Sequence, residues 1–310
     1  MCDKIPLIVV AGATASGKTT LAIELAQRFD GEIVSADSMQ IYKYMDIGTA
    51  KPTAEERAAA VHHMIDFVDP KDGYSAAEYT AAAHDVIADI AKRGRIPIMC
   101  GGTGLYINSV ADDVVFGETD SDGELRRELR EYAEKNGNES LWNMLREVDP
   151  VSAQKIHPNN VKRVIRAIEF YRTSGIPISR HAELAKERES RYKPCMMMIF
   201  HDRAKLYDRI NKRVELMLDA GLEAEVMRLK VMGCTADMQS MQGIGYKEML
   251  EYLDGKCEIA EAADRIKQGS RNYAKRQLTW FCRDKRIERI PADTEVFSRA
   301  AELIRAQLDL

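Results

Sequence analysis

The segment from Gly12 to Thr19 constrains the fold of this chain more than any other. It matches the pattern G-x-x-x-x-G-K-[ST], with an apolar run before it and an amphipathic run after it. In that strand–loop–helix context the pattern predicts a phosphate-binding loop, whose backbone N–H groups converge on an anion at the start of a helix. The predicted loop residues are Gly12, Ala13, Thr14, Ala15, Ser16, Gly17, Lys18 and Thr19. We expect the Lys18 ammonium to bind phosphate and the Thr19 hydroxyl to bind Mg²⁺.

Composition narrows the class of protein. The 310 residues are 45% hydrophobic and 30% charged, which is typical of a globular protein. The sequence has no apolar run of about 18 residues, so we expect no membrane span. The first residues lead directly into an apolar run, which leaves no room for a signal peptide. The cysteines are scattered without a C-x-x-C pair, and we expect reduced thiols in a cytoplasmic protein that is a monomer.

Short apolar runs alternate with helical patterns in the first third of the chain. Apolar runs cover residues 5–10, 32–36, 63–68 and 96–100, and helical patterns cover residues 19–29 and 76–93. This alternation is typical of a parallel sheet built from βαβ units. With a fifth apolar run at residues 195–200, it predicts an α/β fold: a P-loop NTPase-like parallel sheet flanked by helices.

Residues 118–193 have a different pattern. They are highly charged, and helical periodicity is present at residues 122–136, 139–148 and 160–174, separated by Gly and Pro. We therefore expect an all-helical insertion domain over residues 118–193. The catalytic core would comprise residues 1–117 and 194–310, and its last part would be mostly helical.

Two predicted strand ends carry candidate functional residues. Asp37 follows the second strand, and a glycine-rich turn around Thr103 follows the fourth. Ligands of parallel sheets bind beyond the carboxyl ends of the strands, so Asp37 is a candidate base or magnesium group. An Asp at such a place is also a common N-cap or turn residue. The glycines beside Thr103 either permit a steep turn or allow a ligand to approach, and we favour ligand contact.

Two basic segments stand out against the formal net charge of −4. In residues 161–168 the cations recur three to four apart, on one helical face. In residues 264–283 they alternate with Tyr273, Trp280 and Phe281, aromatic side chains that can stack on bases while cations bind phosphates. Each segment alone is also compatible with a solvated helix face. Together they favour localised binding of a polyanion.

Taken together, the motifs resemble those of the tRNA dimethylallyltransferases, the bacterial adenosine-modifying prenyltransferases. The matching segments run in order along nearly the whole chain, at residues 12–19, 35–42, 45–52, 101–106, 157–169, 244–247 and 274–280. Departures are small: Ala13, Asn160 and Ser270 stand where that family usually has Pro, Asp and Thr.

The resemblance implies a reaction and a set of partners. Such an enzyme transfers a dimethylallyl group from dimethylallyl diphosphate to the N6 amine of the adenosine just 3′ of the anticodon. A helical insertion embraces the anticodon stem-loop of the tRNA, and Mg²⁺ accompanies the diphosphate.

The resemblance also implies roles for individual residues. Asp37 would accept the amine proton, Thr103 would lie beside the reacting groups, and Arg213 would stabilise the leaving diphosphate. The residues implied to contact tRNA are Asp37, Ser38, Met39, Gln40, Thr103, Lys162, Arg163, Val164, Ile165, Arg166, Lys275, Arg276 and Gln277.

Other functions remain open from the sequence. An adenylate dimethylallyltransferase would act on free AMP, ADP or ATP, but it would need neither a helical insertion nor a second basic patch. A P-loop kinase for a small molecule would bind ATP in the same loop. A non-catalytic RNA-binding module would leave Asp37 without a role.

Overall fold

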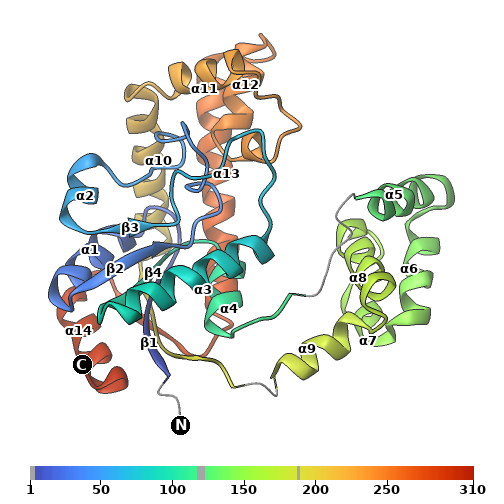
Figure 1. Cartoon of the computed structure of the whole chain (residues 1–310). Coiled ribbons are helices and arrows are strands. Elements are labelled where there is room, and N and C mark those ends of the chain that lie inside the picture. Colours follow the sequence, from blue (N-terminus) through green and yellow to red (C-terminus); the bar gives the residue numbers. More distant parts are fainter. Residues whose placement is uncertain (1–3, 117–122, 187–188) are drawn as a thin grey trace. The chain divides into compact units, whose positions relative to one another are not determined.

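The computed structural model describes residues 4–116, 123–186 and 189–310, and within them a six-stranded parallel sheet forms the centre of the first unit (Figure 1). The strand order is β3-β2-β4-β1-β5-β6. The strands are β1 (Ile5–Ala11), β2 (Gly31–Ser35), β3 (His62–His63), β4 (Ile96–Gly101), β5 (Tyr192–Phe200) and β6 (Ile287–Pro291). The predicted α/β fold with a parallel sheet is confirmed.

The chain divides into two compact units. One comprises Met1–Asp113 with Arg191–Leu310, and the other comprises Val114–Ser190. In the first unit β1 pairs with β4 on one side and with β5 on the other, so Val9 lies opposite both Met99 and Met196. The sheet is therefore completed by chain segments from both sides of the inserted unit.

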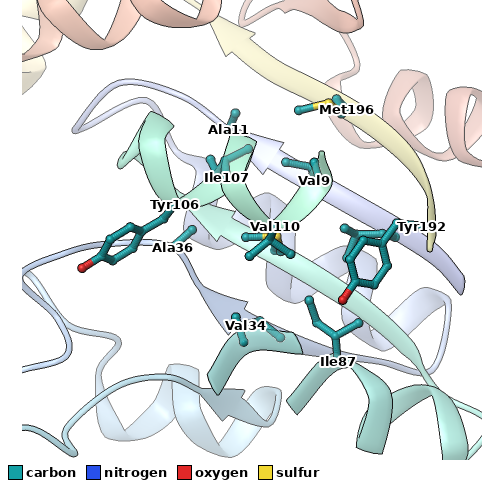
Figure 2. Packing of buried hydrophobic residues seen from close by; sticks show 14 of the residues in the cluster. Val9, Ala11, Val34, Ala36, Ile87, Tyr106, Ile107, Val110, Tyr192 and Met196 are labelled. Carbon is teal, nitrogen blue, oxygen red and sulfur yellow. The ribbon is translucent and has the colours of Figure 1, made fainter. Parts of the chain in front are cut away.

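Helices cover both faces of the sheet, which explains why its central strands are apolar throughout. On one face, α3 (Ala76–Lys92) and α4 (Gly104–Ala111) pack against alternate residues of the strands; Figure 2 shows this core around Val9, Val34 and Val110. On the other face, α1 (Lys18–Arg28) and α14 (Val296–Leu308) cover the intervening residues, such as Ile8 and Ile98.

A second group of helices lies in the C-terminal part of the first unit. It contains α10 (Arg203–Asp219), α11 (Leu222–Val231), α12 (Tyr246–Leu253) and α13 (Ile259–Phe281), with a short 3₁₀ turn at Ser240–Gln242. Together with buried residues that follow β2, namely Ile41, Tyr42 and Met45, they form a separate hydrophobic cluster. This cluster places the segment after β2 against the C-terminal helices. The short α2 (Ala54–Ala59) follows that segment.

The second unit is built from helices around its own core. They are α5 (Glu124–Asn136), α6 (Asn138–Val148), α7 (Pro150–Lys155), α8 (Val161–Ser174) and α9 (Ile178–Lys186). Leu141, Leu145 and Val164 are fully buried in its centre. The buried Asp149 carboxylate accepts hydrogen bonds from the backbone and hydroxyl groups of Ser152 and Ser179, which joins α7 to α9.

One expectation about the strands was wrong, and one strand was not expected. The third strand is only two residues long, since Met64 and Asp66 have φ of 60° and 62°, outside the β region. The sixth strand, Ile287–Pro291, did not stand out in the sequence because charged residues occupy two of its five positions. Among the described residues, no helix has the length and apolar character needed to cross a bilayer.

Candidate active site

The loop between β1 and α1 has the backbone of an anion cradle. Gly12 and Gly17 have φ of 151° and 92°, and the first helical residue is Lys18. His201 Nε2 donates to the Ser16 carbonyl at 2.8 Å, and the N–H of that same peptide, which belongs to Gly17, points the opposite way. Arg209 Nε donates to the Ala15 carbonyl at 2.7 Å. Side chains from outside the loop thus fix two of its peptide planes.

Two polar groups of this loop are suited to an anion. Among the described residues, the buried Ser16 hydroxyl has no hydrogen-bond partner, and it lies 3.1 Å from the place that a Cβ on Gly12 would occupy. Within the part of the chain that the structure describes, Lys18 Nζ makes one long hydrogen bond, 3.4 Å, to the Ala13 carbonyl. Burial lowers the pKa of Lys18, and Arg213 lowers it further, whereas Cys100 and Asp37 raise it. A bound phosphate would supply the missing partners to both groups.

Three cavities meet around the loop. The first is about 290 Å³ and the second about 60 Å³, and Thr14, Asp37, Thr49 and Arg213 border both. The third, about 620 Å³, lies along the loop from Ala15 to Thr20 and again includes Arg213. The half-buried Arg213 guanidinium, 3.4 Å from the Thr14 hydroxyl, therefore borders all three spaces.

The first cavity has an apolar side that the sequence did not indicate. It is formed by Ile210, Val214, Met217, Ile244 and Ile266, which come from α10, α13 and the turn before α12. Tyr273 also borders it, and burial raises the pKa of its phenol to about 12. Ile210, Val214 and Met217 recur at helical spacing on α10 beside Arg213, and this pattern in the sequence would have indicated part of this wall.

Asp37 lies just beyond β2, as expected. Tyr79 of α3 donates to the Ser35 carbonyl at 2.8 Å and so fixes the end of this strand. One Asp37 oxygen accepts the Met39 N–H at 2.9 Å, as in an Asx turn. The Ser38 N–H donates to Thr103 Oγ1 at 3.0 Å, which joins the end of β2 to the turn after β4. Thr103 is thereby held beside the turn that contains Asp37, and Arg213 borders the same two cavities as Asp37.

Gln40 is fully engaged with the protein. Its Oε1 accepts from the Ser35 hydroxyl at 2.9 Å, and its Nε2 donates to the carbonyls of Thr49 and Ala50 at 3.3 and 3.1 Å. The side chain borders the 60 Å³ cavity together with Lys18 and Asp37. Gln40 thus connects the site to the loop that follows residue 45.

The glycines after β4 make room for protein groups. A Cβ on Gly101 would lie 2.1 Å from the Ala36 carbonyl oxygen, and one on Gly104 would lie 2.3 Å from Trp280. A Cβ on Gly102 would lie 2.1 Å from Nε2 of Gln277. That amide donates to the Gly102 carbonyl and accepts the Thr14 N–H, each at 2.9 Å. Gly102 and Gly104 therefore make room for α13, and Gln277 of that helix bonds to the phosphate loop.

Helix α13 presents different residues to its two sides. Gln277 is only 5% exposed, so its side chain serves packing and hydrogen bonding inside the protein. Lys275 and Arg276 are exposed and border a groove of about 400 Å³ with Trp280 and Arg283. The guanidinium of Arg276 lies 5.6 Å from the centre of the Tyr273 ring. This groove is an exposed, positively charged part of α13.

In the second unit, α8 also divides its residues. Lys162 and Arg163 are exposed, whereas Val164 and Ile165 are buried in the core of the unit. Arg166 pairs with the buried Glu169 at 3.0 Å, and Arg126 pairs with it from α5. Side-chain contact with RNA is therefore open to Lys162 and Arg163, and to the half-buried Arg166.

A divalent cation fits this site only together with a substrate. Within residues 4–116, 123–186 and 189–310, no group of three His, Cys, Asp or Glu side chains is placed to hold a metal ion. Thr19 borders two of the cavities beside Lys18. Mg²⁺ commonly keeps several waters and shares substrate phosphates, so one hydroxyl and a bound diphosphate are a suitable ligand set.

Comparison with known proteins agrees with this geometry. The model of the family described as IPP transferase matches residues 40–285. The chain is 52% identical over 275 residues to the tRNA dimethylallyltransferase of Acetivibrio thermocellus, covering 89% of this chain and 88% of that protein. It is 47% identical over 279 residues to the tRNA dimethylallyltransferase of a Thermoanaerobacter species, covering 89% of each.

Solved structures of similar proteins share the fold. A tRNA isopentenylpyrophosphate transferase from Staphylococcus epidermidis matches with a TM-score of 0.72 and 42% identity, covering 99% of both chains. A eukaryotic dimethylallyltransferase acting on tRNA matches with a TM-score of 0.80 and 30% identity, covering 96% of this chain and 77% of that one. On the extent of these matches, the chain belongs to the IPP transferase family.

Proposed function

We propose that this enzyme transfers a dimethylallyl group from dimethylallyl diphosphate to the N6 amine of the adenosine 3′-adjacent to the anticodon in tRNA. The observation that carries the proposal is the 290 Å³ cavity beside the phosphate loop. Its border combines a carboxylate, Asp37, and a guanidinium, Arg213, with an apolar wall. Those are the groups that an amine acceptor, a diphosphate leaving group and a five-carbon allyl chain require.

The reaction exchanges one bond for another. The allylic C–O bond breaks, and its electron pair leaves with the diphosphate. The amine lone pair of adenine forms the new C–N bond, and the amine proton passes to the Asp37 carboxylate. Because that lone pair is delocalised into the ring, a positioned base is worth about 10²–10⁴-fold in rate.

The loop and Arg213 act on the charge that develops on the diphosphate. Backbone N–H groups, Lys18 and Arg213 provide donors that are in place before the reaction begins. Mg²⁺ held by Thr19 and the phosphates would neutralise further charge on the leaving group. The same loop occurs in nucleotide-binding proteins, but here we assign it to a diphosphate that departs.

The exposed cations are suited to the RNA. Lys275, Arg276 and Arg283 surround Trp280 along the groove on α13, where phosphates and an unstacked base find partners. We assign Lys162 and Arg163 of the helical unit to the anticodon stem-loop. The target adenine has to leave its stack to reach Asp37. With tRNA as the acceptor, the reaction takes place in the cytoplasm.

The proposal is tested by incubating the enzyme with labelled dimethylallyl diphosphate and unmodified tRNA, and with AMP as a competing acceptor. We expect label in tRNA and release of diphosphate, and we expect Asp37→Ala to abolish turnover while the tRNA dissociation constant stays unchanged. Asp85→Ala, at a position distant in sequence from the motifs, is the control. Transfer to AMP in preference to tRNA, or no transfer to any tRNA, would refute the proposal.

A further inference from the structure

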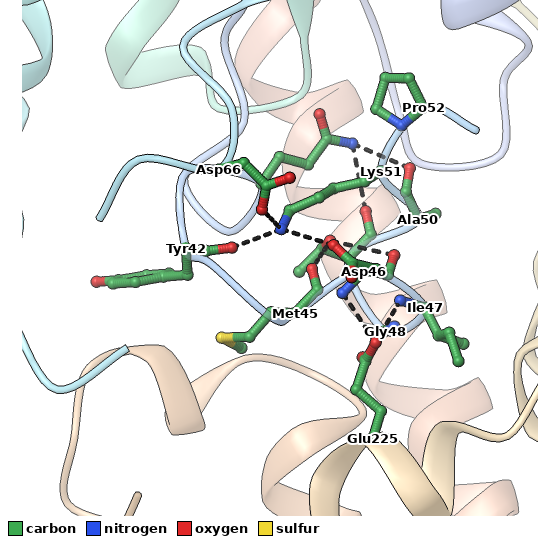
Figure 3. Close-up of polar contacts among 12 residues, drawn as sticks. Tyr42, Met45, Asp46, Ile47, Gly48, Ala50, Lys51, Pro52, Asp66 and Glu225 are labelled. Carbon is green, nitrogen blue, oxygen red and sulfur yellow. Dashed lines mark hydrogen bonds and ion pairs between the residues drawn. The ribbon is translucent and has the colours of Figure 1, made fainter. Parts of the chain in front are cut away.

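The loop between residues 45 and 51 is held by a single buried carboxylate. Glu225 of α11 is 1% exposed, and its Oε2 accepts the N–H groups of Asp46 and Ile47 at 2.9 and 2.8 Å. Its Oε1 accepts the N–H of Gly48 at 3.1 Å and the hydroxyl of Tyr246 at 2.7 Å. Figure 3 shows Glu225 pointing at the backbone of this loop. Four donors thus occupy the approximately four acceptor positions of one carboxylate.

The other end of the same loop is held by a buried ammonium. Lys51 Nζ donates to the Tyr42 carbonyl at 2.6 Å and to Asp46 at 2.8 Å, and it also pairs with Asp66 (Figure 3). The Thr49 hydroxyl donates to the Met45 carbonyl at 2.6 Å. The loop backbone is therefore restrained at both ends, at residues 46–48 by Glu225 and at Lys51 by the Tyr42 carbonyl and Asp66.

This loop forms the side of the site that faces the phosphate loop. Gly48 and Thr49 border the 290 Å³ cavity, Thr49 and Ala50 border the 60 Å³ cavity, and Ala50 and Lys51 border the 620 Å³ cavity. The carbonyls of Thr49 and Ala50 also hold the amide of Gln40. A shift of the loop backbone would change all three spaces and would release Gln40.

We propose that Glu225 is a positioning residue for the transfer reaction: by holding the amides of residues 46–48, it sets the distance between this loop and the phosphate loop. The inference rests on the proposed function, since the cavities between the loops are where we place the substrates. Gly48 is part of the arrangement, because a Cβ there would lie 2.6 Å from the Tyr246 ring. The Tyr246 ring thus packs directly against the loop at Gly48.

Glu225→Gln is the decisive variant. A glutamine amide has a similar shape, but its NH₂ group would face either the two N–H donors of Asp46 and Ile47 or those of Gly48 and Tyr246. The loop backbone would move away from the NH₂ group of the glutamine, because two donors that face each other repel. Since displacement of reacting groups by about 1 Å can reduce rates about 10²-fold, we expect kcat to fall about 10- to 100-fold. The KM values for tRNA and for dimethylallyl diphosphate should change less than about threefold, because the exposed cations and the phosphate loop are untouched.

Glu223→Gln is the matched control. Glu223 lies two residues away on the same helix and also accepts a tyrosine hydroxyl, that of Tyr252 at 3.4 Å, but at an exposed site. We expect wild-type kcat from this variant. Both variants are assayed at least 15 °C below their unfolding midpoints, so that a loss of stability alone does not lower the folded fraction. A Glu225→Gln enzyme that unfolds at a lower temperature but has wild-type kcat would overturn the proposal.

A measurement without turnover separates this inference from the proposed function. In Glu225→Gln we expect amide hydrogen exchange at residues 46–48 to accelerate at least tenfold, with no change in the core of β1. If the wild-type enzyme transfers nothing to tRNA, the proposed function fails, while this exchange result still reports whether Glu225 holds the loop. If Glu225→Gln does not fold, Tyr246→Phe decides: a several-fold lower kcat at unchanged KM supports the proposal, and wild-type kcat overturns it.

Discussion

Two glycine-rich turns follow neighbouring strands of the sheet, and they look alike in the sequence but serve different ends. In the turn after β1, glycines with positive φ shape a backbone cradle that borders cavities. In the turn after β4, the spaces beside Gly101, Gly102 and Gly104 are filled by Ala36, Gln277 and Trp280, respectively. The first turn is open to a ligand, and the second is open to a helix of the same chain.

The difference teaches how a glycine-rich strand-to-helix turn should be interpreted. Absence of a side chain permits close approach, but the approaching group can be substrate or protein. The two turns are also connected, since Gln277 bonds to Thr14 in one and to Gly102 in the other. Packing at the second turn therefore determines the geometry of the first.

Removing the cation of the first turn should have the largest effect. We expect Lys18→Met to lower kcat about 10³-fold, because a preorganised donor to the diphosphate is lost, with little change in the unfolding temperature. Steady-state kinetics and thermal unfolding measure the two quantities. Lys92→Met, at the exposed end of α3, is the control. If Lys18→Met also lowered the unfolding midpoint substantially, the first turn would serve stability like the second, and the distinction between the turns would be lost.

Adding one carbon to the second turn should give the opposite result. In Gly101→Ala the new Cβ would lie 2.1 Å from the Ala36 carbonyl oxygen. Because that oxygen belongs to the backbone, no side chain can rotate to relieve the clash, and the backbone after β2 or β4 has to shift. We expect the free energy of unfolding to fall by at least about 3 kcal/mol in chemical denaturation. Gly73→Ala, where the nearest atom is 3.7 Å away, should be neutral. Equal stability of the two variants would show that the turn after β4 is not tightly packed.

Destabilisation away from both turns should leave catalysis intact. Hydrogen bonds from Arg93 lower the pKa of the buried Glu32 to about 2, against the opposing effect of burial, and His63 lowers it further. Because the folded pKa lies below the ordinary value of 4.5, this stabilisation is complete above pH 4.5 and is lost as the pH falls towards 2.

Glu32→Gln should abolish this dependence on pH. We expect it to reduce the free energy of unfolding at pH 7 by up to about 3 kcal/mol and to flatten the curve of stability between pH 5 and pH 2, at unchanged kcat. Denaturation at a series of pH values measures the effect. Asp89→Asn, which removes an exposed partner of Arg93, should leave the curve nearly unchanged. A parallel loss of kcat in Glu32→Gln would mean that stability alone influences the site.

The connection between the turns should give the smallest effect of the series. Gln277→Leu leaves the Thr14 N–H and the Gly102 carbonyl without partners, and we expect about 2 kcal/mol of destabilisation and about a tenfold loss of kcat. Affinity for tRNA should stay constant, in contrast to Lys275→Ala on the exposed side of the same helix. A weaker affinity for tRNA in Gln277→Leu would instead assign Gln277 to the RNA interface.

Most of the fold was predictable because its signals are local. The apolar runs of β1, β4 and β5 and the loop from Gly12 to Thr19 follow from periodicity and spacing, and so do the helices of the inserted unit. The third strand is shorter than predicted because Met64 and Asp66 adopt positive φ in a segment with apolar composition. The sixth strand was not predicted, because its pairing with β5, about 90 residues earlier in the chain, determines it.

The site was predictable only in part. The position of Asp37 after a predicted strand and the motif from Gly12 to Thr19 identified two parts of the site. The structure places Asp37 and Arg213 on the same two cavities. Gln277 was expected among the tRNA contacts because the resemblance to the dimethylallyltransferases implied it, and the structure places its side chain in the interior. Glu225 had no signal: in the charged stretch of α11, only tertiary packing distinguishes the buried Glu225 from the exposed Glu223.

The bond between Thr14 and Gln277 has a consequence for how the protein is made. A ribosome completes the phosphate loop among its first twenty residues, but the group that holds the loop emerges more than 250 residues later. The pairing of β1 is likewise incomplete until β5 is synthesised, after the inserted unit. A nascent or prematurely ended chain therefore carries the motif without the contacts that Gln277 and β5 supply.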